Sequence, residues 1–157
     1  MSTPETTPSP QKDPVRFQRA NYVVSNLERA CQFYCGVLGM SLAFEKVSEP
    51  DSYSYDVFEI DKQHRMRFAI LSTPSQQRVM ALTEITDPEL PATPLPRRAA
   101  IVLDVADIDG VVAGAKELGL SVYEEDALET HDGRRGREVG IVDADGNLVV
   151  IYNIPAI

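Results

Sequence analysis

The sequence predicts an α+β protein in which one strand–helix–strands unit occurs twice. Strand patterns and a helical pattern follow each other in the same order in both halves, and a proline-rich segment separates the halves. Two short motifs also recur in the same order: Val24-Ser25-Asn26-Leu27 with Val105-Ala106-Asp107-Ile108, and Leu38-Gly39-Met40-Ser41 with Leu118-Gly119-Leu120-Ser121. Such self-similarity indicates an internal duplication rather than two unrelated domains.

The first half begins with a strand and a helix. Ser25 or Asn26 is a suitable N-cap, and apolar residues follow at helical spacing until Gly39, which is typical of a helix end. Alternating or apolar runs bounded by turn residues predict the strands of this half, which are Phe17–Val24, Ser41–Val47, Tyr53–Ile60, Met66–Leu71 and Val79–Ile85.

The second half repeats this order. Asp107-Ile108-Asp109 opens a helix that we expect to end at Gly119. The turn Asp143-Ala144-Asp145-Gly146-Asn147 predicts a closing hairpin. The expected strands are Ala100–Val105, Leu120–Glu124, Val139–Val142 and Leu148–Tyr152.

Proline-rich segments set the expected boundaries. Residues 1–14 contain four prolines and no large apolar residue after Met1, which predicts a disordered tail. Residues 86–98 also contain four prolines and read as a linker. We therefore expect one domain over residues 15–157, with module one at 15–85 and module two at 99–153.

Composition excludes several classes of function. The 157 residues carry a net charge of -9, and such an acidic surface disfavours nucleic acid and anionic membranes as partners. No apolar stretch has the length of a membrane span, and the N-terminus does not resemble a secretory signal. We expect a cytoplasmic protein.

The two cysteines, Cys31 and Cys35, lie four residues apart and would share one helix face. They could form a redox pair or half of a metal site, or they could be two small side chains that pack. No third cysteine or nearby histidine favours zinc. Two free thiols are consistent with a reducing compartment.

Several of these segments together resemble the vicinal oxygen chelate superfamily, which includes glyoxalase I, bleomycin resistance proteins, fosfomycin resistance enzymes and extradiol dioxygenases. The resemblance is carried by residues 24–30, Phe33-Tyr34, residues 37–40, Met80-Ala81-Leu82-Thr83 and Asp143-Ala144-Asp145-Gly146-Asn147-Leu148. It implies two βαβββ modules that form a curved mixed sheet around a cavity. Family members hold a divalent metal or an organic ligand in that cavity.

The resemblance also locates the positions where metal-binding members carry His, Gln or Glu. Here these positions hold Arg19, Ala81, Ala100 and Val150, none of which is a metal ligand. A slip of one residue would bring in Gln18, but its side chain would face the other side of the strand. The glutathione-binding positions of glyoxalase I fall on Val23 and Ile85. We therefore expect no metal, no other cofactor and no lactoylglutathione lyase activity.

The expected cavity is mostly apolar with a few polar groups, which is typical of a small-molecule site. Arg19 is the strongest candidate because a buried guanidinium requires an anion, supplied by a ligand or by Asp104 or Glu84. Alternatively, Arg19 lies at an exposed strand end. Tyr152 could donate a hydrogen bond to a ligand or simply pack. His131 lies in an arginine-rich loop that could cover the cavity as an anion-binding lid or could simply be a flexible polar loop. His64 is expected to be solvated. The candidate ligand-binding residues are Arg19, Asn21, Ala81, Thr83, Ala100, Asp104, His131, Val150 and Tyr152.

The leading hypothesis is a metal-free, glyoxalase- or bleomycin-resistance-like protein that binds a small, partly apolar, anionic organic molecule. The alternative is a lyase, isomerase or tailoring enzyme, with Arg19 stabilising an enolate and His131 or Tyr152 moving the proton. An interaction module without a ligand is a weaker third class, because small residues at cavity positions favour an open pocket. We expect a homodimer, in which the modules could pair within one chain or between chains.

Overall fold

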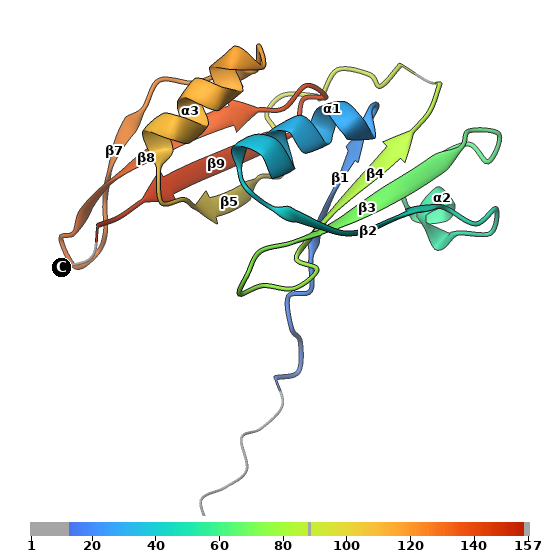
Figure 1. The fold of residues 1–157 in the computed structure, drawn as a ribbon, viewed down its shortest axis with the longest axis horizontal. Coiled ribbons are helices and arrows are strands. Elements are labelled where there is room, and N and C mark those ends of the chain that lie inside the picture. The colour runs from blue at the N-terminus through green and yellow to red at the C-terminus, as the bar shows by residue number, and fades with distance from the viewer. Residues whose placement is uncertain (1–12, 88, 156–157) are drawn as a thin grey trace, which may run out of the picture.

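Two modules lie next to each other in the computed structural model, which describes residues 13–87 and 89–155 (Figure 1). The first module contains β1 (Ala20–Val24), α1 (Leu27–Cys31), the π-helix η1 (Gln32–Val37), β2 (Ser41–Val47), α2 (Tyr53–Val57), β3 (Met66–Ser72) and β4 (Met80–Ile85). The second contains β5 (Ile101–Asp104), α3 (Ile108–Glu117), β6 (Ser121–Val122), β7 (Asp126–Glu129), β8 (Arg135–Val142) and β9 (Leu148–Asn153). The predicted α+β class is confirmed.

Each module builds one mixed sheet, and the strand order is repeated. The first sheet has the order β1-β4-β3-β2, with β1 parallel to β4 and the other pairs antiparallel. The second has the order β5-β9-β8-β6, with β5 parallel to β9 and β7 added against β8. The shared order is the structural counterpart of the sequence repeat.

Side-chain caps and glycines bound the helices as the sequence predicts. The side chain of Asn26 accepts a hydrogen bond from the backbone of Arg29, and Asp107 does the same for Gly110. Gly39 and Gly119 follow the helical segments with φ of +81° and +77°, which a side chain would oppose. The first helical segment differs from the prediction in one respect, because it continues beyond Cys31 as a π-helix.

The predicted strand over Tyr53–Ile60 is wrong, because this segment forms helix α2. The side chain of Ser52 caps the helix by accepting a hydrogen bond from Ser54. Tyr55 and Ile60 are buried, while Tyr53 and Val57, one helical turn apart, are exposed. Serine and tyrosine alternate over residues 52–55, which is a pattern typical of a strand. The segment is a helix because only one of its sides packs against the protein.

Two strands of the second module also differ from their predictions. The strand expected at Leu120–Glu124 is reduced to Ser121–Val122. Asp126–Glu129, which was not predicted as a strand, pairs with the first half of β8. Because that half of β8 has a partner, β8 starts at Arg135 instead of Val139.

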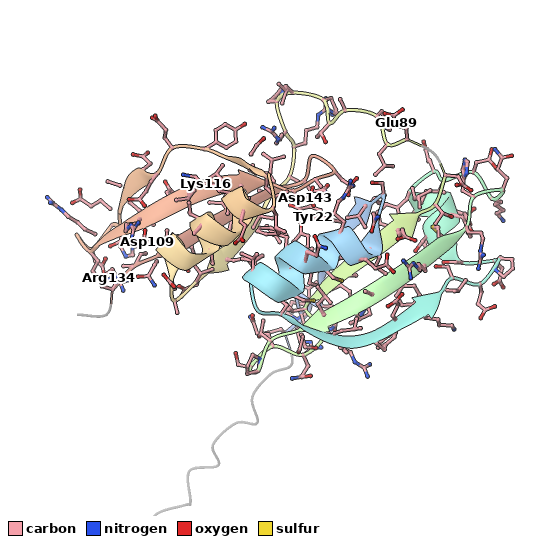
Figure 2. All side chains as sticks on the ribbon, turned by 45° about the horizontal axis from the view of Figure 1, so that its top comes forward. Tyr22, Glu89, Asp109, Lys116, Arg134 and Asp143 are labelled. Atoms are coloured by element: carbon pink, nitrogen blue, oxygen red, sulfur yellow. The ribbon has the colours of Figure 1, made fainter. Side chains whose placement is uncertain are left out.

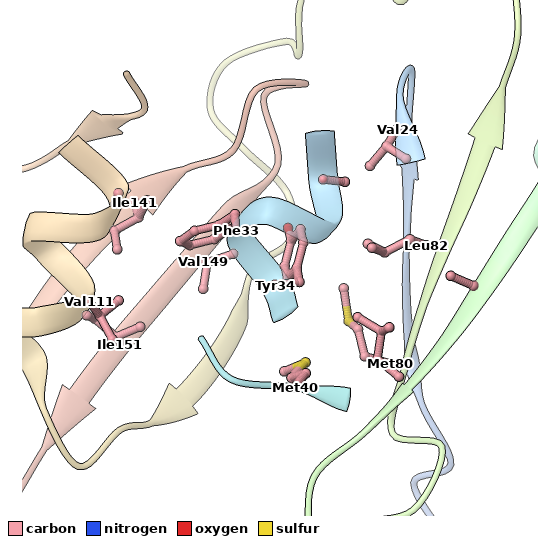
Figure 3. Close-up of a cluster of buried hydrophobic side chains, with 14 of the residues drawn as sticks. Val24, Phe33, Tyr34, Met40, Met80, Leu82, Val111, Ile141, Val149 and Ile151 are labelled. Atoms are coloured by element: carbon pink, nitrogen blue, oxygen red, sulfur yellow. The ribbon is translucent and has the colours of Figure 1, made fainter. Parts of the chain in front are cut away.

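One hydrophobic core joins both modules through their helices. Phe33 and Tyr34 of η1 lie between side chains of the first sheet, such as Leu82, and side chains of the second, such as Val149 (Figure 3). Helix α3 packs directly on η1. The helices α1 and α3 therefore lie on the same side of the two sheets (Figure 1).

Most of the predicted N-terminal tail, residues 1–12, lies outside the described residues. The last two residues of that tail, Asp13 and Pro14, are described and are both exposed. None of the helices in the described ranges combines the length and hydropathy that a membrane crossing requires.

Candidate functional site

The face of each sheet that points away from α1 and α3 carries most of the candidate residues; we call it the open face. On β4, Met80 and Leu82 belong to the core, so Ala81 and Thr83 point to the open face. Asn21 of β1 lies beside Ala81 in the ladder and shares this orientation. Alternation along the strands therefore places these three side chains on one face of the first sheet.

Four candidates line one cavity of about 290 Å³ on the open face of the first module; we call it the Arg19 cavity. Phe68, Ile70 and Ala81 form apolar parts of its wall. Serines of the segment between β2 and α2, and of α2 itself, also line it. The polar residues of the lining are Arg19, Asn21, Ser48, Ser52, Ser54 and Thr83.

Arg19 lies one residue before β1 and is exposed in a single chain, not buried as the sequence analysis expected. None of its guanidinium nitrogens lies within 4 Å of a carboxylate among residues 13–87 and 89–155. The alternative pairing with Glu84 is wrong, because Glu84 accepts hydrogen bonds from the backbone of Leu27 and from Arg67 on the helix side of the sheet. Arg19 is thus a cation open to a ligand.

Asn21 and Thr83 form the second polar feature of the cavity. The hydroxyl of Thr83 donates a hydrogen bond of 3.0 Å to Oδ1 of Asn21. This contact fixes the amide so that its NH₂ group stays available as a donor. The cavity therefore offers a charged fork and a neutral donor above an apolar wall, a combination suited to an organic anion.

Three other candidates line a separate groove of about 530 Å³ between the modules: Ala100, Asp104 and Tyr152. This groove also contains Phe17, Met40 and Met80, and it follows the outer edge of β5. Val150 lies between Val102 and Gly140 in the second sheet, facing away from the buried Val149 and Ile151. The second group of candidates thus occupies the open face of the other module.

His131 is separated from these residues. It is exposed in the turn between β7 and β8, at the outer end of the second module where Figure 2 labels Arg134. In that turn Thr130 bonds to Asp132 and to the backbone of Arg134. The turn covers neither the Arg19 cavity nor the groove, so the predicted lid is not found in a single chain.

The residues at the family's metal positions do not fit a metal. Arg19 has only donor nitrogens, and Ala81, Ala100 and Val150 have no donor atoms in their side chains. No cluster of three or more His, Cys, Asp or Glu side chains suited to an ion occurs in the described parts of the chain. These four side chains can contribute hydrogen bonds and charge, from Arg19, and apolar contact, from the other three.

The sequence analysis missed the hydroxyl side of the Arg19 cavity. Ser48, Ser52 and Ser54 reach it because the segment after β2 turns back and forms α2 on the open face. Tyr55 of α2 packs there with Met66 and Ile85. The turn signal Pro50-Asp51-Ser52 followed by helical spacing could have indicated this arrangement.

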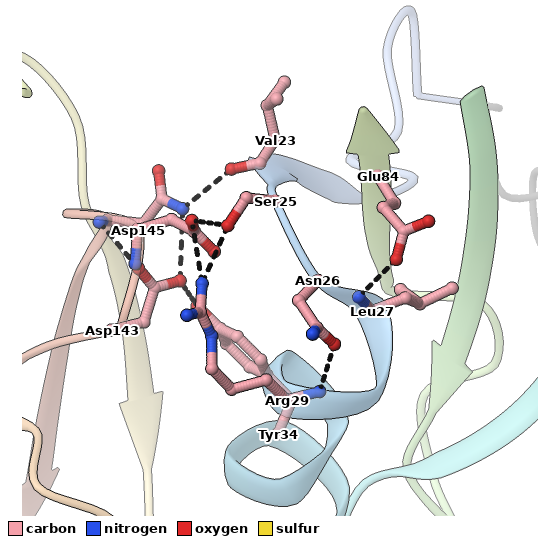
Figure 4. A network of polar contacts seen from close by, with 10 residues as sticks. Val23, Ser25, Asn26, Leu27, Arg29, Tyr34, Glu84, Asp143 and Asp145 are labelled. Carbon is pink, nitrogen blue, oxygen red and sulfur yellow. Dashed lines mark hydrogen bonds and ion pairs between the residues drawn. The ribbon is translucent and has the colours of Figure 1, made fainter. Parts of the chain in front are cut away.

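The junction between the modules explains the Asp143–Asn147 motif (Figure 4). Asp143 accepts hydrogen bonds from the backbones of Asp145 and Asn147, which closes the turn. The side chain of Asn147 donates to the carbonyl of Val23, and Asp145 accepts from Ser25 and Arg29. This motif therefore joins the two modules, and none of its residues lines the Arg19 cavity.

Comparisons with known proteins agree with this architecture. Residues 16–151 match the family model described as the Glyoxalase/Bleomycin resistance protein/Dioxygenase superfamily. A search of curated protein sequences found no significant match.

Three solved structures illustrate the shared fold. A glyoxalase family protein from Bacillus cereus has a TM-score of 0.70 and 17% identity, over 95% of this chain and 100% of that one. TnmS3, an antibiotic-binding protein from Streptomyces sp. CB03234, has a TM-score of 0.58 and 18% identity, with coverages of 92% and 100%. FosX, a fosfomycin resistance protein from Listeria monocytogenes solved with Mn(II) and sulfate, has a TM-score of 0.56 and 10% identity, with coverages of 91% and 93%.

Proposed function

We propose that this chain, which belongs to the glyoxalase/bleomycin resistance protein/dioxygenase superfamily, binds a small, partly apolar organic anion in the Arg19 cavity without a metal. One observation carries the proposal. Arg19 lines a cavity with an apolar wall, and its guanidinium has no carboxylate partner in the described part of the chain. A ligand carboxylate, enolate or phenolate would supply that partner.

The cavity also suggests how the rest of the ligand is held. Phe68 and Ile70 provide apolar contact, and Phe68 packs edge-on against Phe44 with ring centroids 5.9 Å apart. At about 290 Å³ the cavity lies near the lower end of the range for small-molecule sites. The ligand is therefore compact unless another surface extends the site.

Metal independence is part of this proposal and depends on the donor set. Three of the four positions that carry ligands in metal-binding members hold Ala or Val here, and the fourth holds Arg19. Elemental analysis after dialysis should find no stoichiometric Zn, Ni, Mn or Fe. About one such ion per chain would contradict the proposal.

The enzymatic alternative has less support. It requires a group that moves a proton beside Arg19, yet Tyr152 lines the groove between the modules and His131 lies outside both hollows. Neither shares the Arg19 cavity in a single chain. Ligand sequestration without turnover is therefore the function that the geometry favours.

The test uses a panel of small aromatic and branched aliphatic carboxylates, each paired with its neutral amide. We expect some acids to raise the melting temperature and to return from incubation with unchanged mass, while the matched amides have little effect. A changed mass would support the enzyme instead. Failure of every acid to stabilise the protein would contradict the anion proposal.

Arg19→Met should weaken binding of the stabilising acid at least tenfold, which is about 1.4 kcal/mol. The melting temperature of the free protein should change little, because no internal carboxylate loses a partner. Arg135→Met, which removes an exposed arginine of the second module, is the matched control and should bind normally. Equal affinity of the Arg19→Met variant would remove Arg19 from the site.

A further inference from the structure

A third hollow, of about 210 Å³, lies between the linker and the β8–β9 turn; we call it the linker cavity. Its walls come from both modules. The linker contributes Thr93, Arg97 and Arg98, β1 contributes Tyr22, and the second module contributes Asn147 and Leu148. None of the nine candidate residues from the sequence analysis lines it.

Arg97 lines this cavity and has a hydrogen-bond donor without a partner in the described residues. Its Nη1 donates a hydrogen bond of 2.9 Å to the hydroxyl of Tyr123, and its guanidinium lies 5.9 Å from the centre of that ring. Its Nε is buried and has no hydrogen-bond partner in the described residues. Nε and Nη2 form the side of the guanidinium that carboxylates and phosphates bind with two parallel hydrogen bonds.

The positive charges of Arg97 and its neighbour Arg98 also have no acidic partner nearby in the described residues. Within the described residues neither Arg97 nor Arg98 lies within 4 Å of a carboxylate, although the chain carries a net charge of -9. The acids of the nearby turn are already engaged. Asp145 accepts from Ser25 and Arg29, and Asp143 accepts from Tyr34 and Asn147.

A buried donor without an acceptor is unfavourable, and so is a partly buried cation without an anion. Both features occur at Arg97, next to a hollow large enough for an oxyanion and a few attached atoms. Tyr123 contacts the guanidinium through the opposite nitrogen. Within the described residues no anion meets this side chain, and a small rotation would bring its buried Nε to an anion in the hollow.

We propose that the linker cavity is a second binding site, independent of the Arg19 cavity, for a small oxyanion of the carboxylate or phosphate type. Arg97 turns its Nε and Nη2 toward the anion and binds it with two parallel hydrogen bonds, and Arg98 adds charge. Because Tyr22 and Leu148 belong to different modules, the bound anion also contacts both sides of the junction.

The experiment titrates the folded protein with inorganic phosphate or with acetate, in buffers whose ionic strength is held constant with chloride. Binding is followed by the NMR resonance of the Arg97 Nε–H group and by the melting temperature. We expect saturable shifts with one anion per chain. Tighter binding of phosphate would indicate a phosphate group as the natural ligand, and tighter binding of acetate would indicate a carboxylate.

Variants then assign the site. Arg97→Met should weaken binding at least tenfold, and Arg97→Lys, which keeps the charge but loses the fork, should also weaken it severalfold. Arg135→Met should bind within twofold of the parent. If Arg97→Met does not fold, Arg97→Lys and the Nε–H resonance still decide the question.

Absence of saturable binding for both anions would overturn the proposal, as would equal affinity in the Arg97→Lys and parent proteins. Neither result would affect the Arg19 cavity, which is tested by a different ligand panel and a different variant.

Discussion

The hydroxyl of Tyr34 donates a hydrogen bond of 2.8 Å to Oδ2 of Asp143, from the π-helix of the first module to the closing turn of the second. Tyr34 is fully buried, and Asp143 is only 7% exposed. Burial raises the pKa of Tyr34 well above its ordinary value, and the charge of Asp143 raises it further. The phenol therefore remains a protonated donor throughout the neutral range.

Removing this donor should destabilise the fold. Tyr34→Phe keeps the ring but leaves Asp143 with one donor fewer, so we expect the free energy of unfolding to fall by about 1.5–3 kcal/mol. Urea denaturation measures this change. The control is Tyr53→Phe at a tyrosine that is 73% exposed, where the change should stay within about 0.5 kcal/mol. Equal losses of unfolding free energy in both variants would show that the buried hydrogen bond to Asp143 does not stabilise the fold.

The contact between α3 and η1 requires a glycine at position 114. A Cβ added there would lie 2.9 Å from Cγ1 of Val37. We expect Gly114→Ala to destabilise the protein by about 1–2 kcal/mol, because the overpacking cost exceeds the gain in helix propensity.

A double-mutant cycle separates these two effects. In a Val37→Ala background the clash is absent, so Gly114→Ala should become neutral or stabilising. Chemical denaturation of the four proteins gives the coupling energy. A cycle without coupling would mean that the helices can move apart at no cost.

The thiols of Cys31 and Cys35 should be unreactive in the folded protein. Burial raises the pKa of Cys31 to about 12, with a further contribution from Cys35, and burial also raises the pKa of Cys35. At pH 8 both thiols stay protonated, so alkylation by iodoacetamide should be far slower in buffer than in guanidinium chloride. Comparable rates would contradict the packing interpretation and would restore the redox or metal hypothesis.

The same shifts predict a pH dependence of stability. Unfolded thiols ionise near pH 8.5, roughly the ordinary cysteine value, while folded Cys31 keeps its proton up to about pH 12. In that window the unfolded state binds fewer protons, so the free energy of unfolding falls as the pH rises. The Cys31→Ser/Cys35→Ser variant should lose part of this slope.

The open faces lead us to expect a homodimer. Val102 is 61% exposed and Tyr123 52% exposed on the second module, and Phe17 is 80% exposed beside the groove. A second copy covering such side chains would bury more than roughly 1,000 Å². Light scattering should give twice the 17.3 kDa chain mass, and Val102→Asp should shift the equilibrium toward monomer. The monomer mass at all micromolar concentrations would contradict this expectation.

Local rules were sufficient for most of the fold. Asn26 and Asp107 cap the helices, Gly39 and Gly119 follow them, and the Asp143–Asn147 turn closes the last hairpin, because each depends on neighbouring backbone groups. Strand alternation likewise placed Asn21, Ala81 and Thr83 on one face. These features involve interactions over a few residues, which a sequence displays directly.

Only the tertiary structure decided which side chains from distant segments lie together. It turned Tyr53–Val57 into a helix on the open face, which brought three serines to Arg19, and it separated Arg19 from Asp104, Tyr152 and His131. It also placed Arg97 against Tyr123, a residue 26 positions away. The sequence by itself determined the repeat, the helix caps and the residue types at the four positions where metal-binding members carry ligands. The grouping of side chains into cavities depends on long-range packing between the modules, and no local pattern encodes it.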